Sequence, residues 1–414
     1  MYWDPEVESP ATIAVIGCGP IGIEAALYGR FLGYDVDLFD AKRPAHEVVR
    51  WNARSMNVAV AACTTPLGIS ALNGQSPDYK TRPMDQIWSG SQYAEEYLIP
   101  IAKSDLIVDG IHINSPVIEV GRVRYYREEI GDWQDRANDE FRLVVASRDR
   151  GVYTARADII LDCRGTFADT EGYGPGGAQT ANAAAVQEQL HTWLPGDPRF
   201  ENRMLDGKLT IVFGNTERAV RFVEEWAKLL KDGQNDSDKN VTGKLTWLVP
   251  SSRSDSQSIE AIDGDRWRRA MASATSVITT RGVEKIDFVE SAKTWKLQIS
   301  YEDDSTTEIV GEVFAPFTNA LPTTSIGPTL YCDQPAVAAG SLFADSNSEG
   351  SFYPNWAGWK HATGEPNYYR LGAKEFPFDA RGLAEGFQQI KEVFALLGAR
   401  EALDLYDILR KQNR

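Results

Sequence analysis

The sequence is poor in the residues that support several common chemistries. It has only four cysteines and four histidines in 414 residues. The cysteines (Cys18, Cys63, Cys163 and Cys332) stand far apart, and no C-x-x-C pair occurs. Neither a dithiol redox pair nor a structural zinc site is therefore encoded, so we expect no bound metal and a reducing compartment.

Long apolar runs and an excess of basic residues are also missing. No apolar stretch approaches the roughly 18 residues of a membrane span, and the N-terminus lacks the pattern of a signal peptide. Asp and Glu number 59 against 43 Lys and Arg, which gives a net charge of −16. This balance disfavours nonspecific binding to nucleic acid or anionic lipid. We expect a cytoplasmic protein with a small-molecule substrate, no nucleic-acid or membrane partner, and a homodimer as the commonest assembly.

What the chain does contain is ordinary globular composition. Hydrophobic residues make up 43% and charged residues 25%, so most of the chain should fold. Its length predicts two or three domains.

The strongest local signal lies in the first forty residues. Residues 12–16 (TIAVI) form the unbroken apolar run of a buried parallel strand. A glycine-rich turn, Gly17-Cys18-Gly19-Pro20-Ile21-Gly22, follows directly and reads as a complete G-x-G-x-x-G. Apolar residues then recur at helical spacing. The first glycine permits the tight turn, the second lets backbone approach a pyrophosphate, and the third allows close helix packing.

A second strand, residues 35–39 (DVDLF), ends at Asp40, which stands 23 residues after Gly17. A carboxylate at this place accepts hydrogen bonds from ribose hydroxyls. It would also repel a 2′-phosphate, because two negative charges would lie close together. The segment therefore predicts a site for FAD or NAD rather than NADP. The alternative is a glycine turn in an α/β protein that binds no ligand.

Five segments resemble bacterial FAD/NAD(P)-binding oxidoreductases related to thioredoxin reductases and to lysine and ornithine N-monooxygenases. The five are residues 17–40 (GCGPIGIEAALYGRFLGYDVDLFD), 65–72 (TPLGISAL), 97–107 (YLIPIAKSDLI), 162–167 (DCRGTF) and 365–376 (EPNYYRLGAKEF). The resemblance implies FAD binding and two-electron redox chemistry, without a defined substrate. It also implies an α/β fold in which a discontinuous Rossmann-like FAD domain (8–168 and 320–414) carries an inserted second Rossmann-like nucleotide domain (200–318).

In flavoproteins of this kind the C-terminal helix points its start at the flavin ring, where negative charge collects on reduction. Arg50 could pair with the pyrophosphate and Trp51 could cover an aromatic ring, although a surface arginine and a core tryptophan are equal alternatives. The expected cofactor contacts are Gly17, Gly19, Pro20, Ile21, Gly22, Asp40, Arg50, Trp51, Gly165, Tyr369, Gly372, Lys374 and Gly382.

Two residues are candidates for catalysis. His361 is the one histidine near the expected flavin end of the chain, so it is the candidate general acid or base. Lys374 could hydrogen-bond the flavin pyrimidine or stabilise a reduced anion; a surface lysine is the alternative. His361 also ends an aromatic segment, residues 352–361, which suits either a substrate wall or interdomain packing.

The inserted domain departs from the pattern at its glycine turn. Residues 209–213 (LTIVF) read as its first strand, but the turn after them is Gly214-Asn215-Thr216-Glu217-Arg218-Ala219. Thr216 replaces the second glycine and would fill the space of a pyrophosphate, and Glu217 adds a negative charge. The sequence therefore leaves undecided whether the inserted domain binds a nicotinamide cofactor. NAD(P)H remains a candidate reductant of an FAD-dependent reductase or monooxygenase, and the alternative is a noncatalytic FAD- or NAD-binding protein with a degenerate second site.

Overall fold

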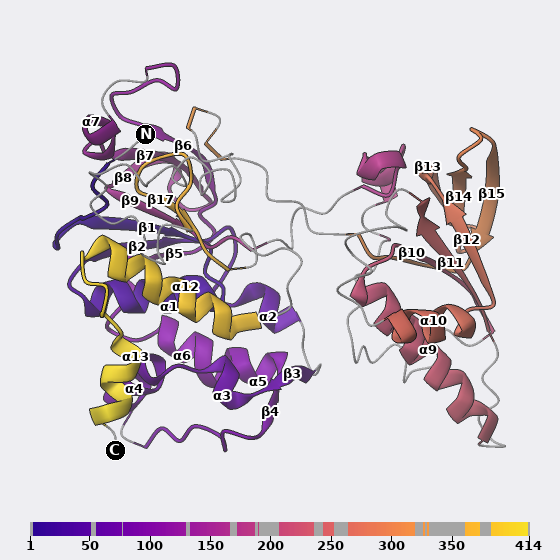
Figure 1. Cartoon of the computed structure of the whole chain (residues 1–414), viewed down its shortest axis with the longest axis horizontal. Coiled ribbons are helices and arrows are strands. Elements are labelled where there is room, and N and C mark those ends of the chain that lie inside the picture. Colours follow the sequence, from indigo (N-terminus) through magenta and orange to yellow (C-terminus); the bar gives the residue numbers. More distant parts are fainter. Residues whose placement is uncertain are drawn as a thin grey trace. The chain divides into compact units, whose positions relative to one another are not determined.

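The structure is a computed structural model, and it consists of two compact units (Figure 1). Unit 1 comprises residues 1–168 and 322–414, and unit 2 comprises residues 169–321. The structure describes residues 3–50, 55–76, 78–129, 133–165, 172–186, 189, 207–235, 243–251, 264–318, 326–327, 329–330, 361–372 and 382–412.

Unit 1 is built on a five-stranded parallel sheet with β1 at its centre. The strand order is β17(Tyr368–Arg370), β9(Ile159–Asp162), β1(Thr12–Ile16), β2(Asp35–Phe39) and β5(Ile111–His112). From β1 the chain runs to β2 on one side and later returns as β9 on the other. Such a reversal of strand order opens a crevice at the carboxyl ends of the strands, where ligands bind in open α/β sheets.

Alternation along β1 separates two cores in unit 1. Ile13 and Val15 pack in one core with helices α1(Pro20–Phe31) and α12(Gly382–Leu397). Ala14 and Ile16 pack in another with the antiparallel strands β6(Val117–Arg122), β7(Phe141–Ser147) and β8(Gly151–Ala157). Successive strand residues point to opposite faces, so β1 is apolar throughout because both faces are covered. Figure 1 shows the resulting three layers.

Further short elements of unit 1 surround this framework. They are α2(His46–Arg50), β3(Ser55–Ala59), α3(Val60–Cys63), α4(Pro66–Gln75), β4(Ile87–Ser89), α5(Gly90–Tyr93), the π-helix η1(Ala94–Leu98), α6(Ile99–Ala102), the 3-10 turn η2(Val108–Gly110), α7(Trp133–Ala137) and α13(Leu405–Gln412).

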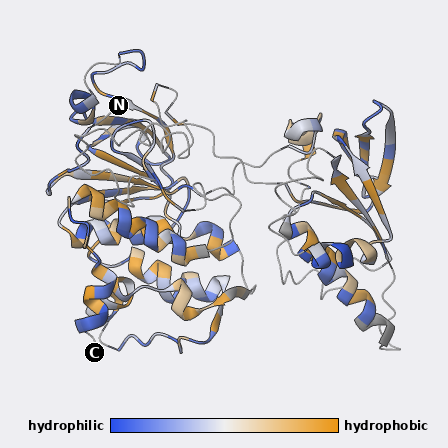
Figure 2. Cartoon of the chain, in the orientation of Figure 1, coloured by the Kyte–Doolittle hydropathy of each residue, from blue (hydrophilic) through white to orange (hydrophobic). Residues whose placement is uncertain are grey.

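Unit 2 repeats the same plan. Its parallel sheet has the order β12(Ser276–Thr280), β11(Lys244–Pro250), β10(Leu209–Phe213) and β16(Val313–Pro316). Helices α9(Glu217–Asn235) and α10(Gly264–Ser273) cover one face, and the antiparallel strands β13(Gly282–Val289), β14(Thr294–Ser300) and β15(Thr306–Gly311) cover the other. Figure 2 shows apolar residues along the central strands of both units.

The predicted α/β class with Rossmann-like units is confirmed, and the expected strands at the two glycine turns are present. Unit 2 includes residues before position 200, where the sequence suggested its start. Residues 172–186, with the 3-10 turns η3(Pro175–Gly177) and η4(Ala183–Val186), belong to it because they pair with β13. Val283 N–H donates to the Tyr173 carbonyl at 2.7 Å.

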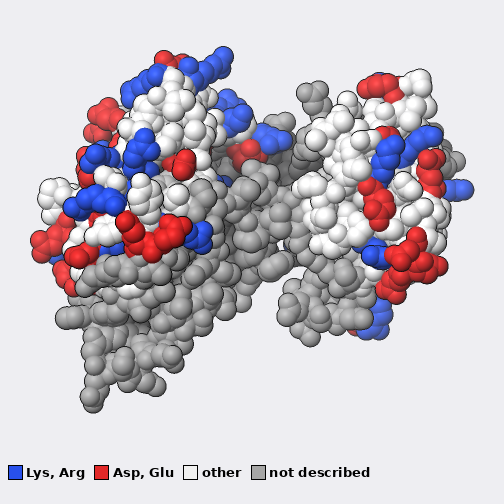
Figure 3. All heavy atoms as spheres, turned by 90° about the horizontal axis from the view of Figure 1, so that it is seen from above, with Lys and Arg blue, Asp and Glu red and all other residues white. Residues whose placement is uncertain are grey.

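The charged surface is mixed in sign. Figure 3 shows acidic and basic side chains interspersed on the described surface of each unit in that view. Among the described residues, no helix combines the length and apolar character needed to cross a bilayer.

Candidate functional site

The turn between β1 and α1 is shaped by two close backbone approaches. Gly17 has φ +108°, and a Cβ on it would lie 2.7 Å from the Cys163 carbonyl oxygen. A Cβ on Gly22 would lie 1.7 Å from the Gly17 carbonyl oxygen. Neither position accepts a side chain, so both glycines are required by the fold itself.

Gly19 differs, because no neighbouring atom requires it to be glycine. Among the residues that the structure describes, a Cβ there would meet no atom within 4 Å, so these residues leave the space beside it open. Gly19 is the N-cap of α1, no side chain of the described residues caps the helix, and Pro20 occupies the first turn. The leading N–H groups of α1 and the positive end of its dipole therefore face this open space. That combination suits a phosphate or pyrophosphate.

Asp40 is held over the same turn by backbone donors. Its Oδ2 accepts from Cys18 N–H at 2.6 Å, and its Oδ1 accepts from Lys42 N–H at 2.6 Å. Each carboxylate oxygen has a further lone pair, so the group remains able to accept hydrogen bonds from ribose hydroxyls. The fixed orientation lowers the entropy lost when a sugar binds.

Arg164 is a charged residue beside the turn at Gly17 that the sequence did not single out as a site residue. It follows β9, and its Cα would lie 2.8 Å from a Cβ on Gly17. Its Nε and Nη2 donate to the two carboxylate oxygens of the buried Asp162, at 2.9 and 2.8 Å. Tyr368 Oη donates to the same carboxylate at 3.1 Å. The sequence signal that could have identified Arg164 is its charge, which is opposite to that of Asp162 two residues earlier at the strand end.

The C-terminal segment packs against the first turn of α1. A Cβ on Gly372, where φ is +79°, would lie 3.4 Å from Ile21 Cγ1, and one on Gly386 would lie 2.3 Å from Ile21 Cδ1. Gly372 N–H donates to Oε1 of the buried Gln389 on α12 at 2.6 Å. Helix α12 thus fixes residue 372 beside the candidate pyrophosphate seat.

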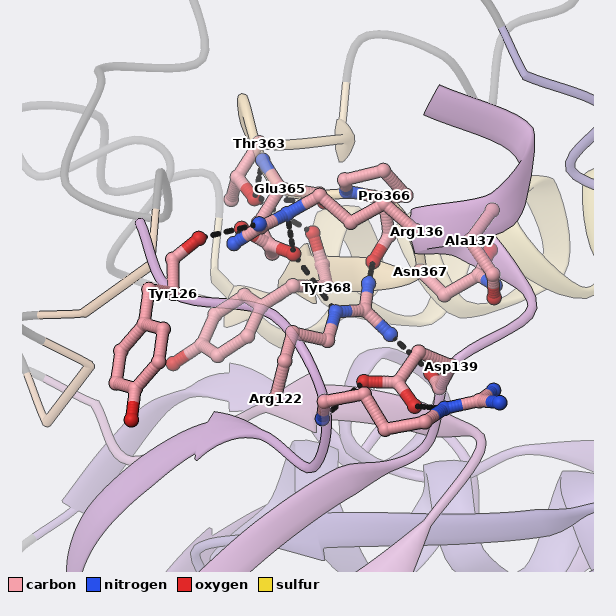
Figure 4. Close-up of polar contacts among 11 residues, drawn as sticks. Arg122, Tyr126, Arg136, Ala137, Asp139, Thr363, Glu365, Pro366, Asn367 and Tyr368 are labelled. Carbon is pink, nitrogen blue, oxygen red and sulfur yellow. Dashed lines mark hydrogen bonds and ion pairs between the residues drawn. The ribbon is translucent and has the colours of Figure 1, made fainter. Parts of the chain in front are cut away.

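A buried ion network anchors the same segment at the opposite end of β17 (Figure 4). Glu365 Oε1 accepts from Arg122 Nε at 2.8 Å and from Arg136 Nε at 2.9 Å. Arg136 Nη2 donates to Glu365 Oε2 at 3.0 Å. Arg122 also donates to the carbonyls of Asp139 and Pro366, and all three ionic side chains are at most 2% exposed. Burial lowers the pKa of Arg122, and the carboxylate of Glu365 opposes that shift.

The structure brings some of the expected site residues together and places others apart. Gly17, Gly19, Pro20, Ile21, Gly22, Asp40 and Gly372 surround the start of α1. Gly165 has φ +65° and follows Arg164, and Gly382 begins α12. Trp51, Lys374 and residues 352–360 lie outside the described residues.

Three expected site residues have environments that fit other roles. Tyr369 is fully buried in the core between the sheet and the helices. The exposed Arg50 pairs with Glu47 at 2.9 Å, as a surface arginine would. His361 is completely buried, with Nε2 2.7 Å from Glu392 Oε2 on α12. These environments are compatible with structural roles, and the expected cofactor or catalytic roles of the three residues stay predictions.

The turn of unit 2 keeps the strand-turn-helix form. Gly214 has φ +117°, and Trp247 Nε1 donates to its carbonyl at 2.7 Å. Oγ1 of Thr216 accepts from Ala219 N–H at 3.3 Å, so the threonine caps its own helix α9.

Solved structures of the same architecture cover nearly the whole chain. A bacillithiol disulfide reductase from Bacillus cereus matches with TM-score 0.56 and 12% identity, over 94% of this chain and 99% of that one. The FAD-bound cadaverine monooxygenase of desferrioxamine biosynthesis from Erwinia amylovora matches with TM-score 0.54 and 11% identity, over 96% of this chain and 96% of that one. Thioredoxin reductase from T. acidophilum matches with TM-score 0.52 and 11% identity, over 94% of this chain and 97% of that one.

No protein-family model matches the chain, and no curated protein matches it in sequence. The structural matches establish the fold alone: an α/β chain with two Rossmann-like units, as in these three solved structures. The resemblance noted in the sequence is confirmed at this level.

Proposed function

We propose that unit 1 binds FAD and that the protein is an FAD-dependent oxidoreductase acting on a small organic substrate. The observation that carries the proposal is the open space beside Gly19, with the uncapped start of α1 facing it and the oriented carboxylate of Asp40 next to it. The similar monooxygenase is bound to FAD, and the shared fold supports the same dinucleotide here. Bound FAD would supply reversible two-electron chemistry.

Each part of the described site has a role in this proposal. The turn and the first N–H groups of α1 bind the pyrophosphate, and Asp40 binds the ribose. Gly372, fixed by Gln389, brings the C-terminal segment to the same end of α1. The start of α12 at Gly382 carries the positive end of the helix dipole, which would favour a reduced flavin anion bound near it.

Chemistry on small organic molecules fits the described cysteines better than disulfide reduction does. Cys18, Cys63 and Cys163 are buried, and none of these three described cysteines forms a disulfide. Burial raises the pKa of the Cys18 thiol, and the nearby Asp40 carboxylate raises it further. Burial also raises the pKa of Cys63 to about 12. A thiol that stays protonated is a poor nucleophile for disulfide exchange. A hydroxylating monooxygenase and a simple reductase fit this site equally.

The alternative is a noncatalytic FAD- or NAD-binding protein, and Thr216 favours it. The fold suggests NAD(P)H as the reductant of the flavin, and this reductant needs a second site that can bind it. The capped turn at Thr216 weakens the expectation that unit 2 provides such a site.

One experiment separates the two functions. The purified protein is reconstituted with FAD if it is colourless, and it is reduced with dithionite in the absence of air. The reduced protein is then mixed separately with oxygen and with each of a panel of small organic acceptors. The enzyme should reoxidise with at least one acceptor about tenfold faster than free reduced FAD does. Reoxidation at the rate of free flavin would favour the noncatalytic binding protein, and failure to take up FAD would overturn the proposal that unit 1 binds FAD.

The role of Asp40 can be tested by substitution. Asp40→Ala removes the ribose acceptor and should weaken FAD binding by about tenfold to a hundredfold, because a charge-assisted hydrogen bond contributes roughly 1.5–3 kcal/mol. Asp35→Ala, at the first residue of the strand that Asp40 follows, is the matched control, because Asp35 pairs with Arg30. Calorimetric titration of the apoproteins with FAD measures both, and equal affinities would contradict the assignment.

A further inference from the structure

The two units can be compared position by position, because their turns have the same hydrogen bonds. Gly17 N–H donates to the Phe39 carbonyl at 2.8 Å, and Gly214 N–H donates to the Leu248 carbonyl at 3.0 Å. Each acceptor is the strand partner of the residue before the turn. Gly214 is therefore the structural equivalent of Gly17, and Leu248 is the equivalent of Phe39.

The residue that the fold needs is kept in unit 2. Gly17 and Gly214 have φ +108° and +117°. A Cβ on Gly17 would lie 2.7 Å from the Cys163 carbonyl oxygen, and one on Gly214 would lie 2.0 Å from the Phe317 carbonyl oxygen. Any side chain at either position would collide with backbone, so the first glycine is retained for a structural reason.

The residue that only a ligand would need is lost. Thr216 stands two residues after Gly214, where unit 1 has Gly19 with open space beside it. The Cβ of Thr216 fills that space, and its Oγ1 accepts the Ala219 N–H, one of the donors that would face a pyrophosphate. The helix start is thus satisfied by its own chain.

The register also removes the sugar contact at its usual place. Asp40 follows Phe39 directly, and the residue that follows Leu248 is Val249. Val249 is 6% exposed and packs in the core between the sheet and α9. An apolar side chain in the core offers no acceptor to ribose hydroxyls.

We infer that unit 2 does not bind a nicotinamide dinucleotide at its strand-turn-helix crevice. Unit 2 keeps the residue that folds the turn and lacks the two that would contact pyrophosphate and ribose. A flavin held by unit 1 is then not reduced by NADH or NADPH docked at this turn. The inference concerns unit 2 alone, so it stands or falls independently of FAD binding in unit 1.

The test introduces a charge at the turn without removing the helix cap. Thr216→Asp retains a good N-cap but places a carboxylate where a pyrophosphate would lie, and Thr216→Ser is the matched neutral control. Binding of NADH and of NADPH is measured by equilibrium dialysis on the wild-type protein and both variants. We expect no saturable binding, or affinities that agree within about twofold among the three proteins.

Saturable binding to the wild-type protein that Thr216→Asp weakens by about tenfold or more, and Thr216→Ser does not, would overturn the inference. Hydrogen exchange of the wild-type protein decides the matter if the Asp variant does not fold. Residues 214–219 should exchange at the same rate with and without either nucleotide, and protection of that peptide by NADH or NADPH would overturn it.

Discussion

Glu24, on helix α1, is a carboxylic acid almost completely removed from water. It is 2% exposed, and Thr65 Oγ1 donates to its Oε1 at 2.8 Å. Burial raises its pKa to about 7, and the hydrogen bond from Thr65 opposes the shift only in part. The folded protein therefore prefers the protonated acid. Its contribution to stability is fully present below the ordinary pKa of 4.5 and is lost as the pH rises through about 7.

Glu24→Gln should remove this pH dependence. Between about pH 5.5 and pH 8.5 the free energy of unfolding of the variant should rise relative to wild type by about 2 kcal/mol. Urea denaturation of both proteins at the two pH values measures the difference. Glu128→Gln, at an exposed position, should give a curve parallel to that of wild type. Parallel curves for Glu24→Gln would show that the buried acid does not titrate in this range.

At the scale of elements, helix α12 fixes the segment that packs against the start of α1, and it does so through a polar contact with Gly372. Gln389 Oε1 accepts from Gly372 N–H, and Gly386 on the same helix lies against Ile21. Gln389→Leu should leave the Gly372 donor unsatisfied, at a cost of about 1–3 kcal/mol in the free energy of unfolding. It should also accelerate FAD release, because residue 372 would no longer be fixed at the cofactor end.

Chemical denaturation and stopped-flow release of FAD measure the two effects of Gln389→Leu. Glu385→Ala, on the first turn of the same helix, is the control and should change neither quantity appreciably. A loss of stability with an unchanged release rate would mean that residue 372 does not contact the cofactor.

The helix starts also show what sequence can and cannot predict. An apolar run followed by a strained glycine predicts strand, turn and helix in both units, since these signals are local. Val249 could not be recognised as the equivalent of Asp40. It stands 35 residues after Gly214, whereas Asp40 stands 23 residues after Gly17, so spacing alone misaligns the two. The hydrogen bonds of the turn were needed to align them.

At the scale of the whole molecule, unit 1 is closed by contacts between distant parts of the chain. Arg122 and Arg136 meet Glu365 more than 220 residues later, with unit 2 between them in sequence. Such a pairing could not be predicted, because nothing local marks two arginines as partners of one distant glutamate. Removing a buried carboxylate that two guanidinium groups share is strongly destabilising, because each guanidinium group would remain charged and desolvated.

Glu365→Ala should therefore destabilise unit 1 by about 3–5 kcal/mol. Hydrogen exchange with mass spectrometry can resolve the units. Peptides from β6, β9 and β17 should lose protection, and peptides from β10 and β11 should keep it. Glu119→Ala, an exposed substitution on β6, is the control. Equal loss of protection in both units would show that they unfold together.

The binding of FAD at the start of α1 is the claim on which the account depends, and a titration of the apoprotein tests it most directly. Gly19→Val would fill the open space with a side chain. Gly74→Val is the matched control, because a Cβ on Gly74 would also meet no atom of the described residues within 4 Å. We predict that wild type and Gly74→Val bind FAD and that Gly19→Val binds it at least about 100-fold more weakly with unchanged circular dichroism. Wild-type affinity in a folded Gly19→Val protein would contradict the account.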